Sequence, residues 1–373
     1  MRPRAIHQFV PSLASRDAIG NHTLAVQELL WDMGFESRIY ARETTPDLAG
    51  RALPYEAYVH GRRRRRARRA GLPWIIYQCS IDSPMVELLV RWEEPKVVNY
   101  HNITPGHLLE PWTPRVAHEV GIGRRQLEAL APVAAGAISD SAFNAAELER
   151  LGFCTSLVCP PLFDLSRFAG QPDPKASARL AEAKADGGAD WLFVGRITPH
   201  KAQHDLVKAL AAYRRVYDPK ARLHLVGGSL FAEYEKALRR LVGELGLDGE
   251  VDMPGSVSHP ELVSYYRSAD VLVCASDHEG FCVPLLEAMY HRLPIVAYGA
   301  GAVPETLGGA GLVLADKSPA CLAAGVHRVL SDPGLAASLV REGERRLGEF
   351  SLERSRARFA RALEQILGAG VGR

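Results

Sequence analysis

The sequence decides its fold most clearly at Val271-Leu-Val-Cys-Ala-Ser-Asp-His-Glu-Gly-Phe-Cys-Val-Pro-Leu-Leu-Glu-Ala-Met289. The short apolar run Val271–Ala275 predicts a buried strand. Pro284 predicts the first turn of a helix, because the N–H group that proline lacks has no helical partner there. A buried strand, a polar loop and a helix in this order form the repeating unit of a parallel α/β sheet.

The same alternation recurs along nearly the whole chain. Strands are expected at residues 5–10, 37–40, 74–78, 96–100, 134–139 and 156–159, and again at 191–194, 223–226, 251–253, 271–275, 294–298 and 311–314. Helices are expected at 22–33, 84–92, 142–151, 175–185, 203–216, 230–245, 261–268, 284–292, 319–330 and 351–367. Two such series predict two Rossmann-like, doubly wound α/β domains with parallel sheets.

Prolines and glycines concentrate between residues 160 and 190, where the first series ends. We therefore expect a first domain at residues 1–165 and a second domain at residues 166–350. Two such domains facing each other form a cleft, and open α/β sheets bind ligands outside the carboxyl ends of their strands. Polar clusters at those strand ends are the candidate functional residues.

Length and composition exclude several classes of protein. The 373 residues are 47% hydrophobic and 24% charged, which excludes a disordered chain, a collagen-like repeat and a small disulfide scaffold. The six cysteines are scattered without zinc-site spacing, so they are expected to be reduced and to pack as small apolar residues. The N-terminus has no signal-peptide pattern, and no run of about 18 apolar residues occurs, which predicts a cytoplasmic protein.

The formal net charge of +2 hides a concentrated basic run. Arg62–Arg69 holds seven arginines, and the rest of the chain carries a charge of −5. The simplest interpretation is a solvated face on a surface loop or helix end. There are two sharper alternatives. The run contacts either an anionic membrane surface that holds a lipid substrate, or a phosphorylated substrate. Nucleic acid is not expected as a partner, because no aromatic residues interleave with the run.

Two carboxylates dominate the loop and helix after residue 275. Glu279 is expected in the loop, and Glu287, eight positions later, about one turn into the helix. The N-terminus of that helix offers N–H groups and partial positive charge to an anion. Carboxylates on both sides of such a site suit the hydroxyls of a sugar beside a phosphate. The alternative is that both are solvated surface charges.

Two further loops carry polar or small residues after a strand. Gly195 and Arg196 follow the strand at 191–194, with Lys201 five residues later, and a guanidinium and an ammonium together suit a diphosphate. Gly299-Ala-Gly-Ala-Val-Pro304 superficially suggests a dinucleotide loop, but proline stands where the third glycine belongs. Its small residues predict close approach of a ligand to the backbone.

These motifs together resemble glycosyltransferase family 4. The matching residues are Gly195-Arg196…Lys201, Gly227-Gly228-Ser229, Glu279-Gly-Phe…Glu287-Ala-Met and Gly301-x-x-Pro-Glu305. Members of that family are retaining, nucleotide-sugar-dependent enzymes of the GT-B fold. The resemblance implies a hexosyltransferase in glycan or glycoconjugate biosynthesis. It also implies that the closing helix, at 351–373, packs back towards the first domain and completes it.

The resemblance implies a role for each matched residue. Arg196 and Lys201 hold the departing diphosphate, Glu279 binds hydroxyls of the transferred sugar, and Glu287 binds the ribose. The remaining donor-binding positions are Gly195, Gly228, Gly280, Phe281, Cys282 and Val283. Cys282 departs from the family, which usually has glycine there, and the thiol narrows the approach to the donor.

The first half of the chain contributes fewer matched residues. Gly20 and Asn21 lie where the family has a glycine loop after the first strand, which implies contact with donor phosphates or acceptor. His101, in Tyr100-His-Asn-Ile-Thr-Pro, matches a region where relatives contact the reaction centre; a structural role is the alternative. Asn102 and Ser139 are acceptor-side candidates, although the segment around Ser139 also suits helix capping.

The implied reaction transfers a sugar from a UDP- or GDP-sugar to a hydroxyl of a small-molecule, glycan or lipid-linked acceptor. No Asp-x-Asp motif occurs, so no metal or other cofactor is expected. The alternatives are a sugar-nucleotide epimerase or a phosphorylase of the same fold, and a basic binding module built around the arginine run. An NAD-dependent dehydrogenase lacks its glycine motif here. The nucleotide base, the sugar and the acceptor stay open.

Overall fold

A computed structural model describes residues 4–14, 17–67 and 72–370. The chain divides into two compact units. The first comprises residues 1–106, 115–164 and 350–373, and the second comprises residues 107–114 and 165–349. The segment 107–114, which lies within the first domain in the sequence analysis, therefore groups with the second unit.

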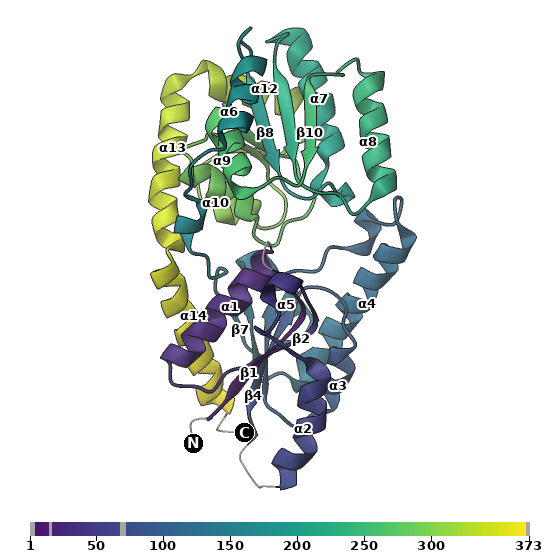
Figure 1. Cartoon of the computed structure of the whole chain (residues 1–373), viewed down its shortest axis with the longest axis vertical. Coiled ribbons are helices and arrows are strands. Elements are labelled where there is room, and N and C mark those ends of the chain that lie inside the picture. The colour runs from purple at the N-terminus through teal and green to yellow at the C-terminus, as the bar shows by residue number, and fades with distance from the viewer. Residues whose placement is uncertain (1–3, 15–16, 68–71, 371–373) are drawn as a thin grey trace. The chain divides into compact units, whose positions relative to one another are not determined.

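The first unit contains a seven-stranded parallel sheet in the order β3-β2-β1-β4-β5-β6-β7. The strands are β1 Ile6–Leu13, β2 Ile39–Thr44, β3 Leu53–Pro54, β4 Trp74–Cys79, β5 Lys96–Tyr100, β6 Gly136–Ser139 and β7 Ser156–Val158. The helices are α1 Ala18–Asp32, α2 Tyr55–Ala67, α3 Met85–Arg91, α4 Pro114–Leu130, α5 Ala142–Arg150 and α14 Leu352–Gly370. In Figure 1 the strands lie between α1 and α14 on one side and α3 and α4 on the other.

The second unit contains a six-stranded parallel sheet in the order β10-β9-β8-β11-β12-β13. The strands are β8 Asp190–Val194, β9 Arg222–Val226, β10 Val251–Gly255, β11 Val271–Cys274, β12 Ile295–Tyr298 and β13 Leu312–Leu314. The helices are α6 Pro174–Ala183, α7 Gln203–Val216, α8 Ala232–Glu244, α9 His259–Ser268, α10 Val283–Tyr290, α11 Val303–Leu307, α12 Pro319–Ser331 and α13 Pro333–Leu347.

The predicted fold class is confirmed, with differences at particular elements. Each expected strand is present, although β2 begins two residues later than expected and runs four residues further, to Thr44. The short strand β3 and the helices α2, α4, α11 and α13 were not expected. The arginine run illustrates the reason: its residues up to Ala67 lie on α2, a helix whose polar sequence shows no apolar face.

The closing helix α14 packs on the first unit, as the resemblance implies. Phe359, Leu363 and Ile366 are fully buried in one cluster with residues of β1, β4, β5 and α1. A Cβ atom at Gly136 would lie 3.0 Å from Ile366, so glycine in β6 allows the helix to approach the sheet closely. Among the described residues, no helix is both long enough and apolar enough to cross a membrane.

Candidate active site

The strand order of the second unit reverses between β8 and β11. The chain proceeds from β8 to β9 and β10 on one side, and β11 then pairs with β8 on the other side. The loops that leave these two strands diverge, and such a switch point is where open α/β sheets bind ligands. Here the main-chain N–H of Asp277 donates to the carbonyl of His200 over 2.8 Å and joins the two loops.

Lys201 and Glu279 meet at this switch point. Lys201 ends the short helix η5 (Pro199–Lys201), and its Nζ lies 2.5 Å from Oε1 of Glu279. Burial disfavours the ammonium, but the Glu279 carboxylate outweighs that effect and raises the pKa of Lys201 above its ordinary value. The Glu279 side chain is only 7% exposed, so the pair is a built feature rather than two solvated charges.

The loop that carries Glu279 is fastened to the next loop of the sheet. The main-chain N–H of Ala302 donates to the Glu279 carbonyl over 2.9 Å, and the Thr306 hydroxyl donates to the Phe281 carbonyl over 2.7 Å. A Cβ atom at Gly301 would lie 2.4 Å from the Glu279 carbonyl oxygen. The small residues after β12 therefore admit the backbone of Glu279, whereas the sequence analysis expected a ligand there.

The predicted glycines after β8 and β9 also serve packing between loops. Gly195 and Gly227 both have positive φ, at 152° and 150°, and a Cβ atom at Gly227 would lie 2.0 Å from the Gly195 carbonyl oxygen. A Cβ atom at Gly228 would lie 2.5 Å from Ser256 Oγ. The side chain of Arg196 is exposed beside these glycines.

Cys282 stands at the start of α10 in a conformation that favours glycine. It is the N-cap residue, with φ of 71° and ψ of 71°, and it is buried. The structure places its thiol near that of Cys274 at the end of β11. The hydrogen bond between them is the main cause that lowers the pKa of Cys274 and raises the pKa of Cys282. Gly280, Phe281 and Val283 accompany Cys282 between Glu279 and Pro284, as the spacing predicts.

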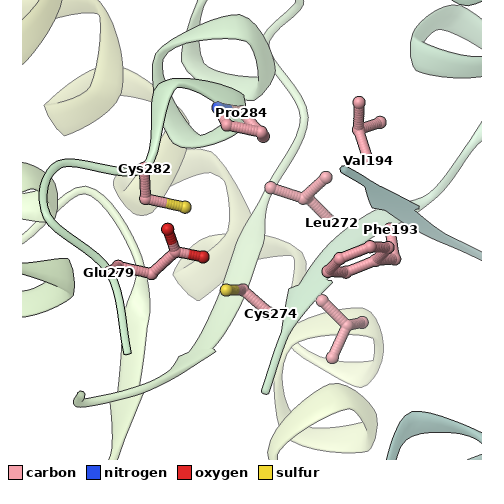
Figure 2. Close-up of a pocket in the computed structure, with 8 residues that line it drawn as sticks. Phe193, Val194, Leu272, Cys274, Glu279, Cys282 and Pro284 are labelled. Atoms are coloured by element: carbon pink, nitrogen blue, oxygen red, sulfur yellow. The ribbon is translucent and has the colours of Figure 1, made fainter. Parts of the chain in front are cut away.

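Figure 2 shows a small pocket around these residues, in which the Glu279 carboxylate points between the two sulfur atoms. The Sγ atoms of Cys274 and Cys282 and a carboxylate oxygen of Glu279 all lie within 4.8 Å of one another. Apolar side chains of β8 and β11, including Phe193 and Leu272, form the other wall. The sequence analysis treated Cys274 only as a buried apolar residue, because cysteine spacing alone gave no sign of this cluster.

Glu287 lies in the second turn of α10, as expected, and is held by Tyr266 of α9. The Tyr266 hydroxyl donates to Oε2 over 2.6 Å. Burial raises the pKa of Glu287, and the bond from Tyr266 opposes that rise. Tyr266 is a site residue that sequence reasoning missed, since its own segment carries no motif.

The His101 side chain is held inside the first unit by polar groups on neighbouring strands. It is 2% exposed, with Nδ1 2.9 Å from Asp140 Oδ2 and Nε2 2.7 Å from Gln78 Oε1. Gln78 Nε2 donates to Gln8 Oε1, and Gln8 Nε2 donates to the carbonyl of Thr23.

The direction of this chain of hydrogen bonds shows that Nε2 of His101 carries a hydrogen. A main-chain carbonyl can only accept, so each amide must present its nitrogen towards Thr23 and its oxygen towards His101. Nε2 of His101 therefore donates to Gln78. Burial raises the pKa of Asp140, and His101 opposes that rise. With both ring nitrogens engaged, His101 fits the structural alternative weighed in the sequence analysis.

The other candidates in the first unit are also engaged locally. The Gly20 N–H donates to the Asp17 side chain in the first turn of α1, and a Cβ atom at Gly20 would lie 2.2 Å from the Ala14 carbonyl oxygen. The Asn21 N–H donates to the Asp17 carbonyl. Asn102, at φ of 78°, donates to Asn144 Oδ1 over 2.7 Å.

The segment around Ser139 follows the capping expectation. Ser139 is buried and donates to the Ser141 carbonyl, and Ser141 is the N-cap residue of α5, whose side chain accepts from the Asn144 N–H. These contacts use the polar atoms of the segment inside the first unit. Helix capping therefore explains the sequence pattern of this segment without any contact to a sugar acceptor.

The basic run begins with an inward-facing arginine. Arg62 donates from Nε and Nη2 to the two oxygens of Glu94, at 2.7 and 3.0 Å, and Glu94 is 1% exposed. This corrects the expectation of a wholly solvated run at its first residue. Residues 68 and 69 of the run lie outside the described residues.

Comparison with known proteins connects this geometry to a family. Residues 175–346, which include the whole switch point, match the family model described as glycosyl transferases group 1. These residues form a glycosyl transferases group 1 domain. The resemblance based on Gly195, Lys201, Glu279 and Glu287 is thereby confirmed.

Curated relatives match longer stretches of the chain than the 172 residues of the family model. The D-inositol 3-phosphate glycosyltransferase of Kineococcus radiotolerans is 30% identical over 278 residues, which are 70% of this chain and 63% of that protein. The GDP-mannose-dependent alpha-(1-6)-phosphatidylinositol monomannoside mannosyltransferase of Mycolicibacterium smegmatis is 33% identical over 190 residues, 48% of each chain. The chain thus spans less than two thirds of the length of these relatives.

Solved structures match the fold of the whole chain, beyond the group 1 domain. Sucrose-phosphate synthase from Thermosynechococcus elongatus has a TM-score of 0.73 at 22% identity, covering 98% of this chain and all of that one. Anabaena HepE in complex with UDP has a TM-score of 0.70 at 19% identity, covering 97% of this chain and all of that one. With the two doubly wound sheets, these matches confirm the predicted GT-B fold.

Proposed function

We propose that this protein transfers a sugar from a UDP- or GDP-sugar to a hydroxyl group of an acceptor, with retention of the anomeric configuration and without a metal. The observation that carries the proposal is the Lys201–Glu279 pair at the switch point between β8 and β11. One cation and one carboxylate at that point match the two halves of a nucleotide-sugar, namely the diphosphate and the sugar hydroxyls.

Lys201 and Arg196 are the proposed partners of the diphosphate. Lys201 is paired with Glu279, and a diphosphate offers its ammonium a more highly charged partner. Arg196 is exposed in the same loop and supplies a second cation. As the nucleoside diphosphate departs, negative charge develops on it, and fixed cations stabilise that charge without reorganisation.

The two glutamates are the proposed partners of hydroxyl groups. Once Lys201 turns to the diphosphate, the buried Glu279 carboxylate requires new donors, and the hydroxyls of the transferred sugar provide them. Glu287 is held by Tyr266 through Oε2, so its other oxygen is available to accept from the ribose. Each proposed contact supplies a hydrogen-bond donor to a carboxylate oxygen of Glu279 or Glu287.

Retention needs the acceptor to attack the face from which the diphosphate leaves. The departing diphosphate oxygen then takes the acceptor proton, so no separate base is required. His101 is not assigned as a base in this scheme, because Nε2 donates to Gln78 and Nδ1 pairs with Asp140.

The relatives guide the choice of acceptor. Their names specify an inositol phosphate and a phosphatidylinositol mannoside. We extend this to a polyol or glycan hydroxyl, free or lipid-linked, as the acceptor class for this chain. The arginine run is then a proposed contact for anionic lipid headgroups or for a phosphate on the acceptor.

A nucleotide-binding and turnover experiment tests the proposal. Calorimetric titration with UDP, GDP and their common sugars should give one nucleotide that binds with a single site. Turnover is then followed as release of that nucleoside diphosphate with a panel of polyol acceptors, in buffer containing EDTA. Nuclear magnetic resonance of the product reports the anomeric configuration.

Matched variants make the test specific. Glu287→Ala should abolish nucleotide binding, whereas Glu235→Ala, which removes a half-buried partner of Arg239 on α8, should leave it unchanged. Isomerisation of the donor without an acceptor would identify an epimerase, and a requirement for inorganic phosphate would identify a phosphorylase. Unchanged turnover in Glu287→Ala would contradict the proposed site.

A further inference from the structure

Two thiols and a carboxylate converge on one small cavity in the second unit. Cys274 comes from the last residue of β11, and Cys282 and Glu279 come from the loop and N-cap before α10. All three are buried, and their ligand-type atoms lie within 4.8 Å of one another. Figure 2 shows both sulfur atoms and the carboxylate turned towards the same space.

We propose that Cys274, Cys282 and Glu279 form a binding site for one thiophilic divalent cation of the Zn²⁺ class. Two thiolates and one carboxylate are ligands that zinc accepts, and three protein ligands leave a fourth position for water. At a Zn–S distance of about 2.3 Å, two sulfurs on a tetrahedral ion are about 3.8 Å apart. The two sulfur atoms, which lie within 4.8 Å of each other, therefore need to approach each other by about 1 Å at most when an ion binds.

The cavity fits an ion better than an organic ligand. Its volume is about 10 Å³, which is the space that one water-sized sphere requires. The wall opposite the ligands is apolar, with Phe193, Val194 and Leu272. An apolar wall limits access of water and strengthens the attraction between a bound cation and its thiolates.

Binding leaves the net charge of the buried cluster unchanged. A protonated thiol carries no charge, whereas a metal-bound cysteine is a thiolate. With a divalent cation, the two thiols release their protons, and the two new negative charges balance the ion. Lys201 contacts Oε1, so the ion takes Oε2, and a bound ion and the sugar hydroxyls of the proposed donor compete for Glu279.

A neighbouring hydroxyl supports the thiolate form. Sγ of Cys274 lies 3.4 Å from Oγ of Ser276, which is fully buried. When Cys274 loses its proton, the serine hydroxyl can donate to the sulfur, as groups around metal ligands commonly do. Cys282 itself is the N-cap residue of α10 and has a φ of 71°, in the left-handed region that favours glycine.

The test measures metal binding directly on the full chain, under a non-thiol reductant and without nucleotide. Equilibrium dialysis against Zn²⁺ should give one tightly bound equivalent per chain. Titration with Co²⁺ should produce a thiolate-to-metal charge-transfer absorption that saturates at the same stoichiometry. Neither readout requires turnover, so metal binding and sugar transfer are tested separately.

Three variants decide the outcome. Cys282→Gly suits the positive φ, so it should fold, and it should weaken Zn²⁺ binding at least tenfold and remove the absorption band. Cys274→Ala should do the same. Cys154→Ala, which removes an exposed cysteine, should bind as the parent protein does. Absence of the band, its survival in Cys282→Gly, or its loss in Cys154→Ala would each overturn the proposal.

Discussion

Lys201 Nζ and Glu279 Oε1 lie 2.5 Å apart and join the loops that leave two adjacent strands, β8 and β11. Only 7% of the Glu279 side chain is exposed, and Lys201 is its charged partner. Lys201→Met should lower the free energy of unfolding of the second unit by about 3 kcal/mol, since it leaves a buried carboxylate unpaired. Urea unfolding at pH 7 measures the change.

The matched control is Lys208→Met, which removes a lysine that is 43% exposed and 3.5 Å from Asp205. Its effect should stay within about 0.5 kcal/mol. The double variant Lys201→Met with Glu279→Gln should recover part of the lost stability, because no buried charge remains. Equal losses for Lys201→Met and Lys208→Met would show that the pair contributes nothing specific.

Tyr266 positions Glu287 by a 2.6 Å hydrogen bond. Tyr266→Phe should weaken nucleotide binding about tenfold, which corresponds to the loss of one hydrogen bond to a charged group. Calorimetric titration with the nucleotide that binds the parent protein gives the value. The adjacent Tyr265 donates instead to Asp252, so Tyr265→Phe should leave the affinity unchanged. Equal affinities of parent and Tyr266→Phe would exclude a role in positioning.

His22 makes the first unit sensitive to acid. Burial, with a smaller contribution from His101, lowers the pKa of His22 from 6.5 to about 3. Between these values the unfolded chain binds a proton and the folded chain does not, so stability falls as the pH falls from 6.5 towards 3. The slope attributable to His22 should approach about 1.4 kcal/mol per pH unit.

Subtracting the pH profile of His22→Gln from that of the parent protein isolates this contribution, because both share all other titrating groups. The neutral ring accepts from the Leu162 N–H at Nδ1 and donates to Asn99 Oδ1 at Nε2, which is what protonation disrupts. Parallel profiles between pH 5 and 6.5 would show that His22 binds protons equally in the folded and unfolded states, which would contradict its lowered pKa.

Arg62 stabilises the first unit through Glu94. Arg62→Met should cost about 3 kcal/mol of unfolding free energy, since the Glu94 carboxylate is 1% exposed and loses both of its guanidinium bonds. The control is Arg115→Met, whose side chain is 85% exposed and which should change little. A similar small effect for both would mean that Glu94 is protonated or hydrated in the folded state.

The six remaining arginines between residues 63 and 69 carry a separate prediction. If they contact anionic lipid, each contributes about 1 kcal/mol near the surface. Replacing all six by glutamine should abolish cosedimentation with phosphatidylserine vesicles, whereas Arg62→Met should not. Binding that survives the sixfold replacement would assign membrane contact to another surface.

The sequence predicts this fold well because buried parallel strands are continuous apolar runs. The two-residue strand β3 is too short to show a pattern, and α2 is too polar to show an apolar face. Caps were predicted where their chemistry is local, as with Ser141, whose side chain accepts from an amide three residues later. Pairings across the sheet have no such local signal.

The same distinction applies to the site. The motifs around Lys201 and Glu279 predict that both serve one ligand, and the strand order explains why their loops meet. Tyr266 and Cys274 were missed because their relevance depends on which helix and strand pack beside α10. His101 was assigned from its position in a motif, but its partners are Gln78 of β4 and Asp140, which follows β6, and no local pattern links them to it.

The closing helix α14 has a consequence for synthesis of the chain. Phe359, Leu363 and Ile366 complete the core of a unit whose first strand, β1, begins at Ile6. The 185 residues from Leu165 to Glu349 are translated in between, which takes about 10–40 s at about 5–20 residues per second. During that time the apolar surface later covered by α14 is exposed. The unit that emerges first from the ribosome is therefore the last to be finished.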